Sequence, residues 1–171
     1  MSEQKITVDS LWTYPITGGP GVPQQEVQVT PGGIVGDRDF VLATLTEEGL
    51  KRIGSNQAPE LLTIEYSDDL SVASLAGVEV ELPDEVGEEM WREVYCDEFG
   101  DMTPVFPVSV EHDVAFSELL KRPVKLFKKA KDWQEGRGKI RPRSRANAAL
   151  HIISLASVEA IAEANGVEPD V

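Results

Sequence analysis

The residues best suited to bind a ligand lie in the segment 31–40 (PGGIVGDRDF). Its glycines let the backbone turn tightly and approach a ligand closely. Arg38 offers a planar fork of N–H donors that matches a phosphate group. Asp37 and Asp39 flank this arginine, so the same pattern also fits a structural ion pair between strands. The spacing leaves both interpretations open: an anion site at Arg38, or an arginine that only stabilises the fold.

A second candidate is the breaker-rich loop 17–23 (TGGPGVP), which could expose backbone N–H groups to an anion. No helical pattern begins directly after it, so the loop is neither a P-loop nor a dinucleotide-binding fingerprint. This loop and the segment 31–40 both follow predicted strands. We therefore expect the two to meet at one rim of a barrel, where loops commonly carry function.

The remaining reactive side chains form no recognisable catalytic or metal site. Acidic residues follow Cys96, the single cysteine, and nearby negative charge makes a thiol less reactive. His112 and His151 lack the spacing of metal ligands. Ser154 lies outside any Gly-x-Ser-x-Gly elbow. The sequence therefore predicts no catalytic residue and no metal ligand.

Charge is distributed unevenly along the chain. The protein has 16 Lys+Arg and 30 Asp+Glu, a net charge of −14. Most of the bases lie within residues 121–145. The overall acidity disfavours nucleic-acid binding, because phosphates are repelled by most of the surface. The basic segment 121–145 is either a solvated connector or a site for an anion or a protein partner.

Length and composition narrow the class of protein. A chain of 171 residues suffices for one domain, or for one domain and part of another. A single cysteine excludes an internal disulfide framework, and no apolar run has the length of a signal peptide or a membrane span. We therefore expect a cytoplasmic protein that neither binds nor crosses a membrane.

The elements that must position these residues are mainly short strands. Alternating or continuous apolar runs separated by turn residues predict strands and favour a β-barrel or sandwich. Two apolar stripes with capping residues predict helices. The first runs over 112–121 and is capped by Asp113. The second runs over 155–165, is capped by Ser154 and ends at Gly166. The predicted class is mainly β (β-barrel) with a few short helices, or α+β if the C-terminal helix is counted. The expected strands are 5–12, 26–30, 40–45, 61–66, 71–75, 78–82, 92–96, 105–110 and 125–127.

A series of short motifs, in this order, resembles the MOSC proteins, named for the C-terminal domain of molybdenum cofactor sulfurase. The resemblance begins with Val8, Leu11 and the run 14–16 (YPI), and continues with Val29-Thr30 and the segment 36–42 (GDRDFVL). It extends through three later segments: 59–64 (PELLTI), 116–126 (FSELLKRPVKL) and 151–161 (HIISLASVEAI). The first part is similar to the family's N-terminal β-barrel domain, and the last to the opening of the MOSC domain.

The resemblance implies a role in holding the molybdenum cofactor. Family members include amidoxime-reducing proteins, which reduce N-hydroxylated compounds, and proteins linked to sulfur transfer. Nothing resembles the pyridoxal-phosphate domain of the cofactor sulfurase. In the family, the residues after the YPI motif and the arginine of Gly-Asp-Arg contact the phosphate end of the cofactor. The corresponding positions are Thr17, Gly18 and Arg38, which implies a molybdopterin-type anionic ligand.

Two departures from the family shape the expected organisation. Thr17 stands where the family commonly has a lysine, and the chain ends at Val171, before the family's metal-binding cysteine. We expect a barrel over 1–128, a basic connector over 129–149 and an incomplete MOSC start over 150–171. The chain would be a fragment, a truncated product or half of a split protein, inactive without the missing half or a redox partner. The alternative is a non-catalytic module that uses residues 121–145.

Overall fold

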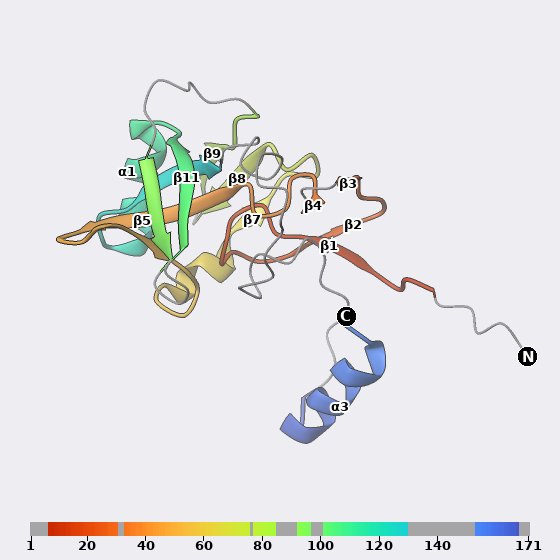
Figure 1. The fold of residues 1–171 in the computed structure, drawn as a ribbon. Helices are drawn as coiled ribbons and strands as arrows, with labels where there is room; N and C mark the ends of the chain where they lie inside the picture. Colours follow the sequence, from red (N-terminus) through yellow and green to blue (C-terminus); the bar gives the residue numbers. More distant parts are fainter. Residues whose placement is uncertain are drawn as a thin grey trace, which may run out of the picture.

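The computed structural model describes residues 7–30, 33–75, 77–84, 92–96, 101–129 and 153–167. Within these residues the chain consists mostly of short strands, with one 3₁₀ helix and two α-helices. The prediction of a mainly β fold with a few short helices is confirmed. Figure 1 shows the strands gathered in one body and the C-terminal helix α3 standing apart from it.

Five strands pair in a closed ring. Neighbours in the ring are antiparallel, except that β10 and β6 are parallel and meet at the single pair Tyr95 and Lys51. A two-residue turn joins β5 and β6 into a hairpin. The order around the ring is β10 (Arg92–Cys96), β11 (Asp101–Pro107), β12 (Lys125–Lys129), β5 (Phe40–Thr46) and β6 (Gly49–Ile53).

Smaller sheets accompany the ring. The N-terminal strands form two separate pairs, and a three-stranded antiparallel sheet follows the 3₁₀ helix η1 (Pro59–Thr63). The pairs are β1 (Leu11–Thr13) with β2 (Val22–Gln24), and β3 (Val29–Thr30) with β4 (Gly33–Ile34). The third sheet contains β7 (Glu65–Tyr66), β8 (Val72–Leu75) and β9 (Val78–Glu81).

The first half of strand β5, residues 40–43, is buried on both faces, because successive residues of a strand point to opposite sides, whereas Leu45 is exposed. Val41 and Ala43 pack with Val105 and Phe127 in a small cluster inside the ring. Phe40 and Leu42 point outward into a larger cluster. That outer cluster also contains residues of η1, β8 and α1 (Val110–Leu120), including Leu61, Leu75 and Phe116. A continuous apolar run, as predicted for this segment, is what such a doubly buried strand requires.

Helix α1 starts earlier than the sequence predicted. Ser109 is its N-cap, and the Ser109 hydroxyl accepts the backbone N–H of His112. Asp113 was the predicted cap, and that prediction was wrong. The Asp113 carboxylate instead accepts the Leu126 N–H at 2.9 Å and lies 3.6 Å from Lys125 Nζ. Asp113 therefore ties α1 to β12.

Helix α3 (Leu155–Asn165) begins and ends as predicted. The Ser154 hydroxyl accepts the Ser157 N–H at 3.1 Å, and Gly166 adopts the left-handed conformation with φ 65°. Its apolar stripe is exposed, since Leu155 and Ile161 keep 41% and 63% of their surface accessible. The predicted helix, with its cap and its stop, is confirmed.

Other predictions were also wrong. The strand expected over 105–110 is strand β11, which ends at Pro107, and Val110 already belongs to α1. The segment 61–66 was predicted as one strand, but Pro59 opens the 3₁₀ helix and only Glu65 and Tyr66 are extended. The loop 17–23 ends in strand β2, where Pro23 pairs opposite Trp12. A two-stranded ribbon has free edges, so the missing N–H of a proline is tolerated there. Of the predicted connector 129–149, Lys129 ends β12, and residues 130–149 lie outside the described residues.

Candidate functional site

The two glycine-containing loops meet, as the sequence predicted. The Tyr14 N–H donates to Asp37 Oδ1 at 2.8 Å, and the Arg38 N–H donates to the Tyr14 carbonyl at 2.6 Å. One step further, the Thr17 N–H donates to the Phe40 carbonyl at 2.8 Å. Residues 14–17 therefore run beside residues 37–40, next to strand β5 of the ring. We call residues 14–19 together with 36–39 the loop pair.

Arg38 is held in place by the loop pair. It adopts the left-handed backbone conformation with φ 56°. Apart from glycine, only Asn and Asp adopt this conformation with any frequency. Its Nη1 lies 2.5 Å from Asp37 Oδ2, and its Cζ lies 5.0 Å from the centre of the Tyr14 ring. The side chain remains 23% exposed. The arginine thus forms an ion pair with its chain neighbour and still presents part of its side chain to solvent.

Thr17 and Gly18 lie deeper than Arg38. Thr17 is 7% exposed, and its Oγ1 has no hydrogen-bond partner among the described residues. Gly18 has φ 86°, and a Cβ at this position would lie 2.9 Å from the Cα of Gly54. Close packing against the turn after β6 therefore explains the glycine without a ligand. The hydroxyl of Thr17 is the unexplained polar group of this loop.

The structure brings Tyr66 to the same loop, which the sequence did not reveal. A Cβ on Gly19 would lie 2.8 Å from the Tyr66 hydroxyl. The Tyr66 side chain therefore fits here only because residue 19 is a glycine. Burial raises the pKa of Tyr66 well above its usual value. Tyr66 follows the 3₁₀ helix that was mistaken for a strand, and no local sequence signal links it to Gly19.

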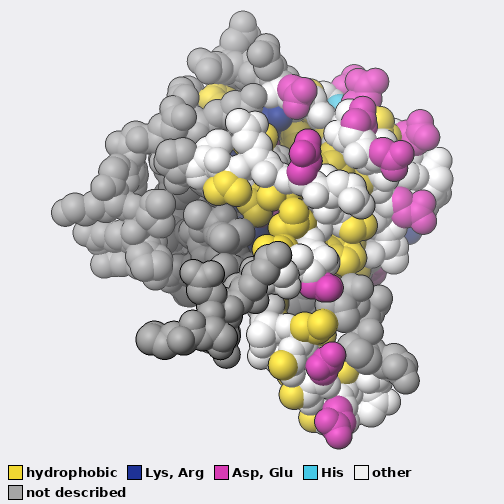
Figure 2. All heavy atoms as spheres, turned by 90° about the vertical axis from the view of Figure 1, so that its right-hand side faces the viewer, with side chains coloured by type: hydrophobic (Ala, Val, Ile, Leu, Met, Phe, Trp, Pro, Cys, Tyr) yellow, Lys and Arg dark blue, Asp and Glu magenta, His cyan; other side chains and the backbone are white. Residues whose placement is uncertain are grey.

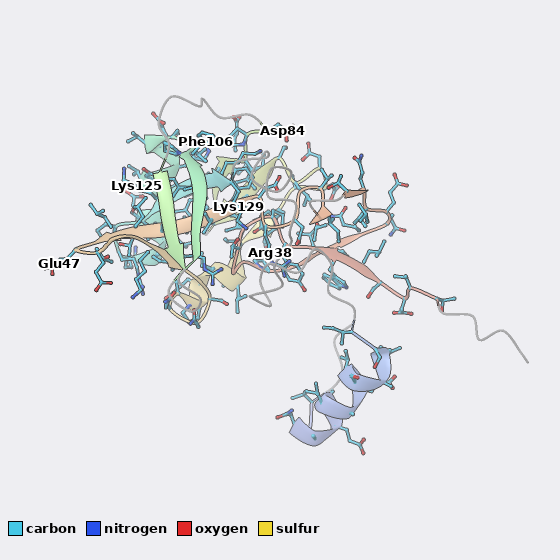
Figure 3. All side chains as sticks on the ribbon, viewed as in Figure 1. Arg38, Glu47, Asp84, Phe106, Lys125 and Lys129 are labelled. Atoms are coloured by element: carbon cyan, nitrogen blue, oxygen red, sulfur yellow. The ribbon has the colours of Figure 1, made fainter. Side chains whose placement is uncertain are left out.

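Lys129 belongs to the basic segment 121–145, which the sequence left open as a connector or an anion site, and nothing in the sequence linked it to Arg38. It lies next to the loop pair, because its N–H donates to the Asp39 carbonyl at 2.8 Å. Burial lowers the pKa of Lys129 to about 8, Asp39 opposes this shift, and the positive charges of Arg38 and Arg52 add to it. Figure 3 shows Arg38 and Lys129 between the five-stranded ring and strands β1–β4. Positive charges from the loop pair (Arg38), β6 (Arg52) and β12 (Lys129) are therefore close enough to affect the pKa of Lys129.

Three other described bases of the segment 121–145 have separate partners. Arg122 donates to the Gln57 carbonyl at 2.9 Å, and Lys125 pairs with Asp113. Lys128 is 4% exposed, and its Nζ donates to the Pro83 carbonyl at 2.6 Å. These contacts stabilise the fold around β12. Residues 130–145 of the predicted basic segment lie outside the described residues.

The histidines and the cysteine considered in the sequence show no sign of a catalytic or metal site among the described residues. The His112 ring contacts the Ser109 hydroxyl through Nδ1 and the Glu81 carbonyl through Nε2. Cys96 is in β10, and His151 lies outside the described residues. Within the described part of the chain, no three His, Cys, Asp or Glu side chains are grouped so that they could hold a metal ion. No helix there has the length and apolar character needed to span a bilayer.

Comparison with known families agrees with this architecture. Residues 5–90 match the family described as the MOSC N-terminal beta barrel domain, a match over half of the chain. The chain belongs to this family, as the order of its motifs suggested. No curated protein matches it.

The matched residues do not close the ring by themselves. They include β5 and β6, whereas β10, β11 and β12 lie beyond residue 90. Arg38 lies within the match and Lys129 outside it. The loop pair is thus a feature of the family segment, and its neighbour on β12 comes from the rest of the chain.

Proposed function

We propose that the chain is the N-terminal part of a molybdenum-cofactor-dependent oxidoreductase, which reduces N-hydroxylated substrates or transfers sulfur. In this proposal Arg38 binds the phosphate end of the cofactor. Membership of the MOSC N-terminal beta barrel domain family supports it. The single observation that carries it is the partly exposed side chain of Arg38, whose guanidinium is held between Asp37 and Tyr14.

The residues of the loop pair fit a phosphate-type anion. The guanidinium is preorganised by the carboxylate of Asp37 and the ring of Tyr14, so little side-chain entropy is lost when it binds. The unpartnered hydroxyl of Thr17 is a neutral donor in the same loop. Gly18 contributes through packing, because its small size lets the loop lie against Gly54. The fit is therefore strongest for Arg38 and weakest for Gly18.

Each residue has a defined task in this proposal. When bound, the molybdenum cofactor supplies the redox chemistry. Arg38 donates charge-assisted hydrogen bonds to the phosphate oxygens. Asp37 orients Arg38 and also accepts the Tyr14 N–H, which fixes the two loops relative to each other. Asp37 acts through Arg38 and is a positioning residue.

The test measures cofactor retained by the full chain. Wild type, Arg38→Gln and Lys125→Gln proteins are purified from cells that make the cofactor. Bound molybdenum is measured by mass spectrometry and pterin by its fluorescence after oxidation. Lys125→Gln is the matched control, because Lys125 carries the same charge on an exposed side chain paired with Asp113. We expect Arg38→Gln to retain about tenfold less of both, since a charge-assisted hydrogen bond contributes about 1.5–3 kcal/mol, and the control to match wild type.

Two results would contradict the proposal. One is equal retention by Arg38→Gln and wild type. The other is a wild-type protein that carries neither molybdenum nor pterin and whose melting temperature is unchanged by added molybdopterin, since a ligand that binds the folded state must stabilise it.

A further inference from the structure

Strand β12 sends two successive lysines to opposite faces of the ring. Lys128 pairs with Phe40, and it lies on the outer side, with its Nζ 4.8 Å from the centre of the Phe40 ring. Phe127 pairs with Val41, and both belong to the inner cluster. Because side chains alternate along a strand, Lys129 lies on the same side as Phe127. It stands at the end of the strand beside Asp39.

Lys129 is surrounded by charged residues from two further segments. Arg52 pairs with Ala43, a residue of the inner cluster, so it starts from the same face of the ring. Arg38 and Asp37 belong to the loop pair, and Asp39 leads into β5. The neighbour of Lys129 on β11 is Val105, which carries no charge. Lys129, Arg38 and Arg52 thus place three positive charges near the two negative charges of Asp37 and Asp39.

We infer that Lys129, with Arg38 and Arg52, binds a phosphate-type oxyanion at the end of the ring that faces the loop pair. This inference extends the proposed function, because it adds cations from β12 and β6 to the site of Arg38. The ligand carries at least two negative charges, as a phosphate monoester does near neutral pH. Lys129 contributes charge, while Arg38 contributes the planar donor geometry.

The arrangement of charges favours an anion at this position. Burial and two neighbouring arginines disfavour the protonated form of Lys129, and the pKa of about 8 reflects both effects. A bound dianion reverses the second effect, so binding and protonation of Lys129 reinforce each other. One described face of the molecule gives an anion little attraction. Figure 2 shows acidic side chains spread over one face of the molecule, with few Lys or Arg among them.

The pH dependence of binding tests this inference on the full chain. The probes are phenyl phosphate and inorganic phosphate, titrated by calorimetry between pH 7 and pH 9.5. A monoester with a second pKa of about 6 stays largely dianionic over this range, so a change in the affinity for phenyl phosphate reports on the protein. Wild-type affinity should fall as the pH rises through 8, because Lys129 loses its proton. Similar affinity for both probes would show that the phosphate group alone is recognised.

Three variants separate the contributions. Lys129→Gln should weaken binding at pH 7 about tenfold, as expected for one charge-assisted contact. Lys129→Arg should keep the affinity and lose the pH dependence, because arginine stays protonated. Lys125→Gln, on the same strand, should behave as wild type. If Lys129→Gln fails to fold, the pH dependence of phosphate affinity in Lys129→Arg still tests the inference, because a profile like that of wild type would overturn it.

The results also distinguish this inference from the proposed function. Wild-type affinity that is constant from pH 7 to 9.5, or equal affinity of wild type and Lys129→Gln, overturns the inference. If Arg38→Gln loses cofactor while Lys129→Gln binds phosphate normally, the proposed function stands alone. If Lys129→Gln loses phosphate while Arg38→Gln retains cofactor, the oxyanion site stands alone.

Discussion

The loop pair and strand β12 use positive charge in different ways. The loop pair contains one arginine, which is fixed by Asp37 and Tyr14 and remains partly exposed. Strand β12 contains three lysines, of which Lys125 and Lys128 bind Asp113 and the Pro83 carbonyl. Only Lys129 adjoins the loop pair. The number of charges in a segment is therefore a poor guide to a site, whereas the direction in which each side chain points is a good one.

The largest expected effect tests whether packing fixes the loop pair. Gly18→Ala should lower the free energy of unfolding by about 3 kcal/mol, because it combines a left-handed backbone with a Cβ 2.9 Å from the Gly54 Cα. Gly36→Ala is the matched control, since Gly36 has φ 82° and nothing within 4 Å of the added Cβ. We expect about 1 kcal/mol for the control. Urea denaturation measures both, and equal losses would show that the contact with Gly54 is unimportant.

A smaller effect tests whether the lysines of β12 stabilise the fold. Lys128→Ala should lower the free energy of unfolding by about 2 kcal/mol, because it removes a buried hydrogen bond to Pro83 and the contact with the Phe40 ring. Lys125→Ala should change stability by less than about 0.5 kcal/mol, as for an exposed ion pair. Phosphate affinity should be unchanged in both variants. If Lys128→Ala lost phosphate affinity while remaining as stable as wild type, our distinction between the two regions would be wrong.

A third effect, seen only as a change of stability with pH, concerns Lys129, which adjoins both regions. Its pKa is lowered from 10.5 to about 8 on folding, so between these values the unfolded chain binds more protons than the folded one. Stability should therefore rise with pH from about 8 to about 10.5, and the unfavourable contribution of the charge should be complete below pH 8. Lys129→Gln lacks this rise. Melting temperatures of the two proteins, measured in phosphate-free buffer, should follow different slopes over that window, and parallel slopes would contradict the assignment.

Several parts of the fold were predictable because they depend on local chemistry. The apolar run of β5, and the Ser154 cap and Gly166 stop of α3, were recognised from neighbouring residues alone. The segment 61–66 was not, because an alternating pattern of apolar residues does not distinguish a strand from a 3₁₀ turn that buries Leu61. The cap of α1 was wrongly assigned to Asp113. Ser109 and Asp113 are both chemically suitable caps, so residue type alone does not decide between them. The pairing of Asp113 with β12 was decided by tertiary contacts.

The sequence by itself determined the family, the predominance of strands and the presence of an arginine in a glycine-rich turn. These properties follow from residue types and from spacings of a few positions. Only the tertiary structure decided that Arg38 pairs with Asp37, that Gly18 packs on Gly54, and that Lys129 faces the ring interior. The physical reason is register: which residue lies opposite Lys129 depends on how β12 pairs with β5. That pairing joins residues more than eighty positions apart and leaves no local pattern in the sequence.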